Sequence, residues 1–133
     1  MDLNRTPAQI SRAMAEEARA LNHRTLKADA FDNAPSVADT ADGIAAVIQR
    51  LPQAIQQLEA GLQALADDNQ IRLADRHPRE VSAKDVHDAV FDVLWNLKEA
   101  REGLGRLNEH VRAATRRLSN MGGPWPEQDT DED

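Results

Sequence analysis

Apolar residues recur at alternating steps of four and three between residues 86 and 118, and this repeat constrains the fold more than any other feature of the chain. Ten positions follow it without a break: Val86, Val90, Val93, Leu97, Ala100, Leu104, Leu107, Val111, Ala114 and Leu118. A mean spacing of 3.5 residues keeps one seam of a helix turned toward a partner helix, as in coiled coils. The region therefore predicts a long helix that packs along a second one.

Two further repeats precede it. The longer one comprises Val37, Ala41, Ile44, Ile48, Leu51, Ile55, Leu58, Leu62 and Leu65, and the shorter one Met14, Ala18, Leu21, Thr25 and Ala28. Each repeat follows a Ser/Thr-x-x-acid-or-amide sequence, which satisfies the free amides of a first helical turn. These sequences begin at Thr6, Ser36 and Ser82. We expect an all-α chain with helices at about 6–29, 36–74 and 82–120.

The connection between the second and third helices is predicted to be short, so these helices should form a long antiparallel coiled-coil hairpin. The shorter first helix would lie beside the first half of helix 2 and the second half of helix 3, completing a three-helix bundle in one domain, residues 1–123. Pro52 interrupts helix 2 and should kink it. A split at Pro52, giving four helices, is the alternative. Residues 124–133 are expected to form a disordered acidic tail.

The composition excludes several classes of protein. The 133 residues include no cysteine, which rules out disulfides, thiol nucleophiles and thiolate metal sites. Charged residues interrupt every apolar run, and we see no secretory signal, so we expect a cytoplasmic protein with no membrane association. The net charge is −7, and the acidic residues of 127–133 supply five of those negative charges. The rest of the chain is close to neutral.

The most apolar part of the predicted hairpin is the end that helix 1 should leave uncovered. Helix 3 adds Phe91, Leu94 and Trp95 to its repeat there, opposite Leu58, Leu62 and Leu65 of helix 2. A wide apolar surface without intramolecular cover is typical of an interface. We therefore expect a homo-oligomer, with a dimer favoured, that joins through these six residues. The alternative is that helix 1 docks there by another path.

The sequence offers no catalytic, cofactor-binding or metal-ligating motif. The four histidines lack the Glu-x-x-His and His-Glu-x-x-His spacings of helical metal sites, and no serine lies in a Gly-x-Ser-x-Gly turn. The leading interpretation is thus a non-enzymatic module for protein–protein interaction or assembly. A short Pro-Trp-Pro segment around Trp125 is a candidate docking motif for a protein partner.

An alternative interpretation uses the cations that the predicted topology brings to one end of the bundle. They are Arg19, Arg24 and Lys27 near the end of helix 1, and Arg112, Arg116 and Arg117 near the end of helix 3. Such a group could bind nucleic acid or an acidic partner. No aromatic residues alternate with these cations, so the interaction module remains the leading interpretation.

In shape, a long antiparallel hairpin without cysteine resembles the small helical-hairpin substrates of type VII secretion. That resemblance implies a secreted protein, our third interpretation. The predicted turn reads Ala74-Asp75-Arg76-His77-Pro78 and lacks the family's Trp-x-Gly motif, and the chain has no tyrosine for the export signal.

Overall fold

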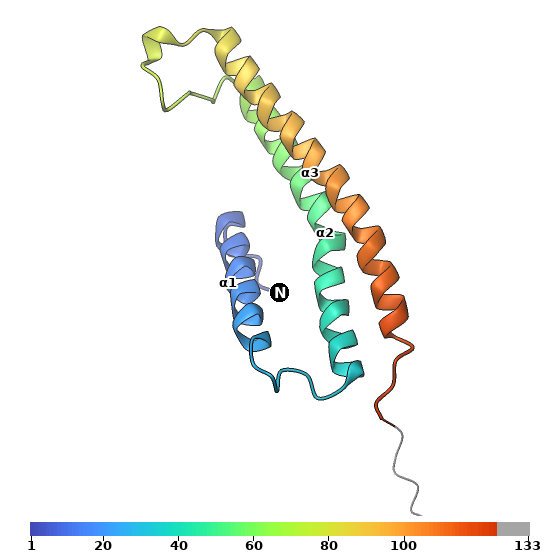
Figure 1. Cartoon of the computed structure of the whole chain (residues 1–133). Helices are drawn as coiled ribbons and strands as arrows, with labels where there is room; N and C mark the ends of the chain where they lie inside the picture. The colour runs from blue at the N-terminus through green and yellow to red at the C-terminus, as the bar shows by residue number, and fades with distance from the viewer. Residues whose placement is uncertain (125–133) are drawn as a thin grey trace, which may run out of the picture.

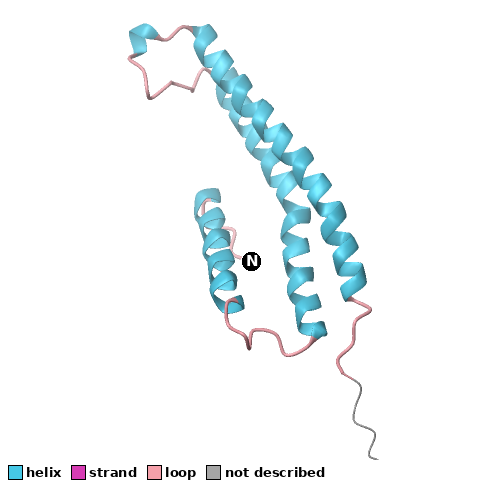
Figure 2. Cartoon of the chain, viewed as in Figure 1, coloured by secondary structure: helices cyan, strands magenta, loops and turns pink. Residues whose placement is uncertain are grey.

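All regular structure is helical in residues 1–124, the part of the chain that the computed structural model describes. The elements are α1 (Pro7–Thr25), α2 (Ala34–Asp67), the short 3-10 helix η1 (Pro78–Glu80) and α3 (Ala83–Leu118). Figure 1 shows their order along the chain, and Figure 2 shows the loops that join them. The predicted all-α class is confirmed for these residues. The predicted tail lies, apart from Pro124, outside them.

Two of the three predicted helix starts are confirmed. The Thr6 side chain accepts a hydrogen bond from the Gln9 N–H, and Ser82 accepts one from the Asp85 N–H, each within a reciprocal capping box. The predicted start at Ser36 is wrong. Asn33 is the capping residue of α2, and Ser36 occupies the third helical position, where its hydroxyl completes the box.

The helices end earlier than the predicted bounds, at residues 25, 67 and 118 rather than near 29, 74 and 120. Asn69 ends α2 by adopting a left-handed conformation, with φ of 55°. The Gln70 N–H then donates to the Leu65 carbonyl at 2.9 Å and the Asn69 N–H to the Ala66 carbonyl at 3.1 Å. This is a Schellman motif. The predicted short connection is therefore wrong, because residues 68–82 form a long loop that contains η1.

Helices α2 and α3 pack against each other in an antiparallel hairpin (Figure 1). Helix α2 continues through Pro52 as one element, so the alternative of four helices is wrong. Figure 1 shows that α2 changes direction near its middle. A proline removes one backbone hydrogen bond and crowds the preceding turn, and Pro52 supplies both effects near that point.

Helix α1 runs alongside the first half of α2, on the side away from α3 (Figure 1). No Cα atom of α1 lies within 8 Å of a Cα atom of α2 or α3. Packed helices bring their nearest Cα atoms within about 6 Å, given axes 8–10 Å apart. The predicted contact of helix 1 with the second half of helix 3 is therefore wrong. Helix α1 has no buried residue.

The described chain has almost no closed core. Among residues 1–124, only Ala45 of α2 and Val90 of α3 are buried, with 5% and 7% of their surface exposed. Most of the other apolar residues between the two long helices are half-buried. In that same range, no helix is both long enough and apolar enough to cross a membrane. The hairpin is thus a single layer of two helices with its sides open.

Candidate interaction surface

The apolar repeat of α3 divides into two sets that differ in burial. Val90, Leu97, Leu104 and Val111, spaced by seven residues, are buried or half-buried. The alternate set consists of Val86, Val93, Ala100, Leu107 and Ala114, and all of these except the half-buried Val86 are exposed. The second row of α3 that packs on α2 is instead a mixed one: Leu94, Arg101, Asn108 and Thr115 are all half-buried.

Helix α2 divides in the same way. One set of its repeat is half-buried, namely Ala41, Ile48, Ile55 and Leu62. The alternate set is Val37, Ile44, Leu51, Leu58 and Leu65, of which all but the half-buried Val37 and Leu51 are exposed. The second packed row is again mixed: Ala45, Pro52, Glu59 and Ala66. In a two-helix coiled coil, both sets of the repeat would face the partner helix. Helices α2 and α3 are therefore both rotated about their own axes, by the same amount, from that orientation.

The centre of the packed seam is polar. Arg101 and Glu59 form a two-pronged ion pair between α3 and α2, in which the Arg101 Nη2 donates to Glu59 Oε1 at 3.1 Å and Nε donates to Oε2. The side chains are only 29% and 16% exposed, respectively. The hydrogen bond to Glu59 raises the pKa of Arg101. Nearby in the same row, the buried Asn108 Oδ1 has no hydrogen-bond partner.

The exposed sets of the two helices lie on one side of the hairpin. Three residues turn an α-helix by about 300°, so each exposed set lies about 60° to one side of its packed set. The two helices are antiparallel, and their exposed sets are displaced in the same direction along each chain. A two-fold axis perpendicular to the plane of α2 and α3 therefore relates them and places both exposed sets on the same side of that plane. We call this surface the outward face. It comprises Ile44, Leu51, Leu58, Leu65, Val93, Ala100, Leu107 and Ala114.

The outward face is apolar along the whole hairpin. The Glu59–Arg101 pair fixes the register, so Leu65 is level with Val93 and Leu51 is level with Leu107. Leu58 is 59% exposed, Leu65 51% and Leu107 47%. Isolated exposed leucines are ordinary on protein surfaces, but a continuous apolar strip usually marks a contact site.

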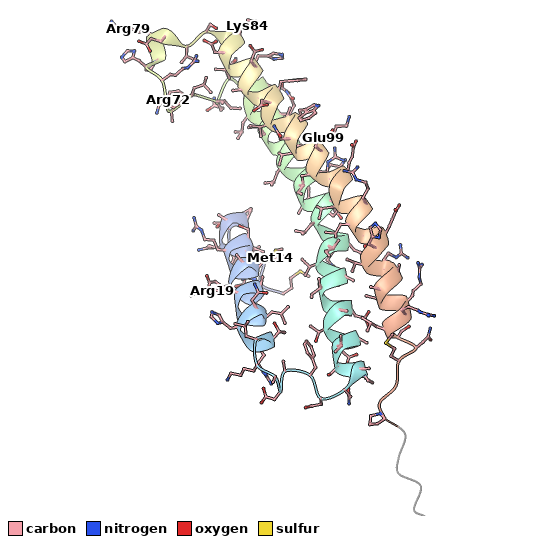
Figure 3. The ribbon with its side chains drawn as sticks, viewed as in Figure 1. Met14, Arg19, Arg72, Arg79, Lys84 and Glu99 are labelled. Atoms are coloured by element: carbon pink, nitrogen blue, oxygen red, sulfur yellow. The ribbon has the colours of Figure 1, made fainter. Side chains whose placement is uncertain are left out.

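A groove of about 940 Å³ separates α1 from α2. Its walls are mostly apolar, with Ile10, Met14 and Leu21 on α1 and Ile44, Val47 and Ile48 on α2. Figure 3 shows Met14 on the side of α1 that faces α2, and Arg19 on the side that faces away. Ile44 belongs to both surfaces, so the α1–α2 groove continues the outward face.

The six residues of the sequence-predicted interface do not form one surface. Leu58 and Leu65 lie on the outward face, whereas Leu62 and Leu94 pack in the seam. Phe91 and Trp95 are 63% and 53% exposed. Phe91 lines a pocket of about 350 Å³ with Gln63 and loop residues, on the opposite side of the hairpin. Periodicity indicated that these residues were apolar and helical, but did not fix the side of the hairpin on which each lies.

The predicted basic end is present as two separate groups. Helices α1 and α3 both end at the same end of the molecule (Figure 1), but they do not approach each other. Arg19 pairs with Glu16 at 3.7 Å and Arg24 with Asp29 at 3.6 Å, which lowers the local positive charge. Nucleic-acid binding and secretion both remain untested predictions of the sequence. Trp125 lies outside the described residues.

Two further observations bear on chemistry. Within residues 1–124, no group of three or more His, Asp or Glu side chains is arranged to hold a metal ion. Comparison with protein families, curated proteins and solved structures found no match to this chain.

Proposed function

We propose that this protein is a non-enzymatic helical interaction module, two copies of which associate through their α2–α3 hairpins. The observation that supports this most is the amount of surface that the single chain leaves open. Its accessible area is 11269 Å². A compact monomer of 14.7 kDa is expected to expose about 6900 Å².

The excess is at least as large as the surface that subunit association removes from one chain. The accessible area exceeds the expected area by more than about 4000 Å². Nine fully extended residues would expose roughly 1500 Å², so residues 125–133 cannot account for this excess. Each chain of an obligate homodimer buries about 1000–2500 Å². The half-buried seam alone gives the hairpin little of the apolar burial that normally offsets chain entropy.

Light scattering on the full chain during size-exclusion chromatography tests this proposal. We expect twice the chain mass of 14.7 kDa. Thermal unfolding of a dimer also depends on concentration, because dilution favours separated chains. We expect the midpoint to rise with protein concentration. A single-chain mass at every concentration, with a constant midpoint, would contradict the proposal.

A further inference from the structure

We infer that a second copy of this chain covers the outward face, so that the two hairpins build one four-helix core. This inference rests on the proposed self-association and adds which surface is used. It assigns the contact to Ile44, Leu51, Leu58 and Leu65 of α2 and to Val93 and Leu107 of α3. Phe91 and Trp95, on the opposite side, stay in contact with solvent.

The direction of the apolar repeat carries the inference. In a two-helix coiled coil, both apolar rows point toward the single partner helix. In a four-helix bundle each helix has two neighbours, so its apolar rows point diagonally between them, toward the bundle axis. Here one row, such as Ile48 and Ile55, packs on the neighbouring helix. The other, such as Leu58 and Leu65, points to the side.

The row of the seam that lies farther from the outward face supports the same arrangement. The mixed row that completes the seam holds Glu59, Arg101 and Asn108. Charged and polar groups are costly at the centre of a core but usual at the flanking positions of a bundle, where ion pairs join neighbouring helices. Their place in the seam therefore indicates that the seam is an edge of the core and that the centre lies beneath the outward face.

Area and continuity favour a second copy as the occupant. The outward face extends along both helices for the whole hairpin, and the α1–α2 groove lengthens it at Ile44. Helix α1 stands farther from α2 than packing allows. An identical hairpin matches this long apolar strip in length and chemistry. It also removes the excess surface of both chains at once, as a self-complementary interface requires.

The experiment places a charge at the centre of the outward face in the full-length protein. Leu58→Glu should raise the dimer dissociation constant at least about 100-fold, because a carboxylate would be buried without a partner. Leu58→Ala should raise it about tenfold. Glutamate and alanine both favour helices, so at low concentration the circular dichroism signal of each variant should match that of the separated wild-type chains. Gln56→Glu, which adds the same charge on the other side of α2, is the matched control.

Trp95→Glu distinguishes this face from the opposite one. If the inference is correct, Leu58→Glu and Leu58→Ala weaken the dimer, while Trp95→Glu and Gln56→Glu leave it within about twofold of the wild type. A dimer that survives Leu58→Glu, or that Trp95→Glu also separates, overturns the assigned face and leaves the proposed self-association standing. A wild-type protein with the mass of one chain overturns both.

Discussion

Asp85 shows how strongly a single side chain defines the start of α3. Its carboxylate accepts a hydrogen bond from the Ser82 N–H at 2.9 Å, and Arg76 lies 3.6 Å away. The backbone hydrogen bond from Ser82 is the largest cause of a lowered pKa at Asp85, followed by the Ser82 side chain. The folded chain therefore stabilises the charged form of Asp85 more than the unfolded chain does.

This lowered pKa predicts a pH dependence of stability. A group whose pKa falls on folding stabilises the fold above its unfolded pKa, which is 3.8 for Asp85. That contribution is lost as the pH falls through the lower folded value. Asp85→Asn should therefore remove part of the acid destabilisation below about pH 4, measured by urea unfolding at a series of pH values.

Asp88→Asn is the matched control, because the Asp88 carboxylate pairs with Lys84 rather than with a backbone N–H. A stability difference between the wild type and Asp85→Asn that stays constant across the acid range would argue against the prediction.

Residue patterns predicted helix starts better than helix ends. Capping is local, so Thr6 and Ser82 could be recognised from a four-residue pattern. At α2 two overlapping patterns compete, and the chain uses Asn33 instead of Ser36. The end of α2 depends on Asn69 adopting a left-handed conformation, which costs an asparagine less than other residues with side chains. The apolar repeat does stop there, because its last member is Leu65 and the next step of four falls on the polar Asn69, but the repeat does not show that this residue turns left-handed.

At the scale of elements, the Glu59–Arg101 pair joins α2 to α3 in a half-buried seam. Removing one partner leaves the other charge poorly solvated, whereas replacing both by apolar residues is often neutral or stabilising. We expect Glu59→Leu and Arg101→Leu each to lower the thermal midpoint. The double variant should recover most of the loss.

This double-mutant cycle is measured at one protein concentration, because association would shift every midpoint. A matched cycle on Lys84 and Asp88, an exposed pair within α3, should show much weaker coupling. The prediction fails if the double variant is less stable than the wild type by the sum of the two separate losses.

Sequence periodicity identified the elements but not their rotation about their own axes. An alternation of four and three is compatible with a two-helix seam and with a larger bundle. The deciding information is tertiary. Partial burial of Leu62 and exposure of Leu58, four residues earlier, show that one row faces the neighbouring helix and the other faces the open side of the hairpin. The interface predicted around Phe91 and Trp95 rested on apolar content and on the hairpin end that helix 1 should leave uncovered. Neither observation fixes the rotation of a helix, so the prediction combined residues from different sides.

At the scale of the whole molecule, α1 is the element whose position needs explaining. It lies along α2 with an apolar row facing the hairpin, yet an open groove separates the two. We expect the second copy to contact this row. Met14→Glu should therefore raise the dimer dissociation constant about tenfold, without changing the helical content.

Sedimentation equilibrium of the full chain measures this effect. Arg12→Glu, which adds a negative charge to α1 at a position outside the groove lining, is the control and should leave the affinity near that of the wild type. Equal affinities for Met14→Glu and the control would show that α1 takes no part in association.

The approximate two-fold symmetry of the hairpin affects the relative direction in which a second hairpin can dock. The layer of Leu65 and Val93 near the loop resembles the layer of Ile44 and Ala114 at the other end, so the long surface reads nearly the same in either direction. A docking hairpin would meet equivalent layers whether its loop lies beside the loop of the first hairpin or beside the other end. Helix α1 is present at one end only and breaks this equivalence. We therefore expect the shortest of the three α-helices, rather than the two longest, to determine whether two associated molecules align head to head or head to tail.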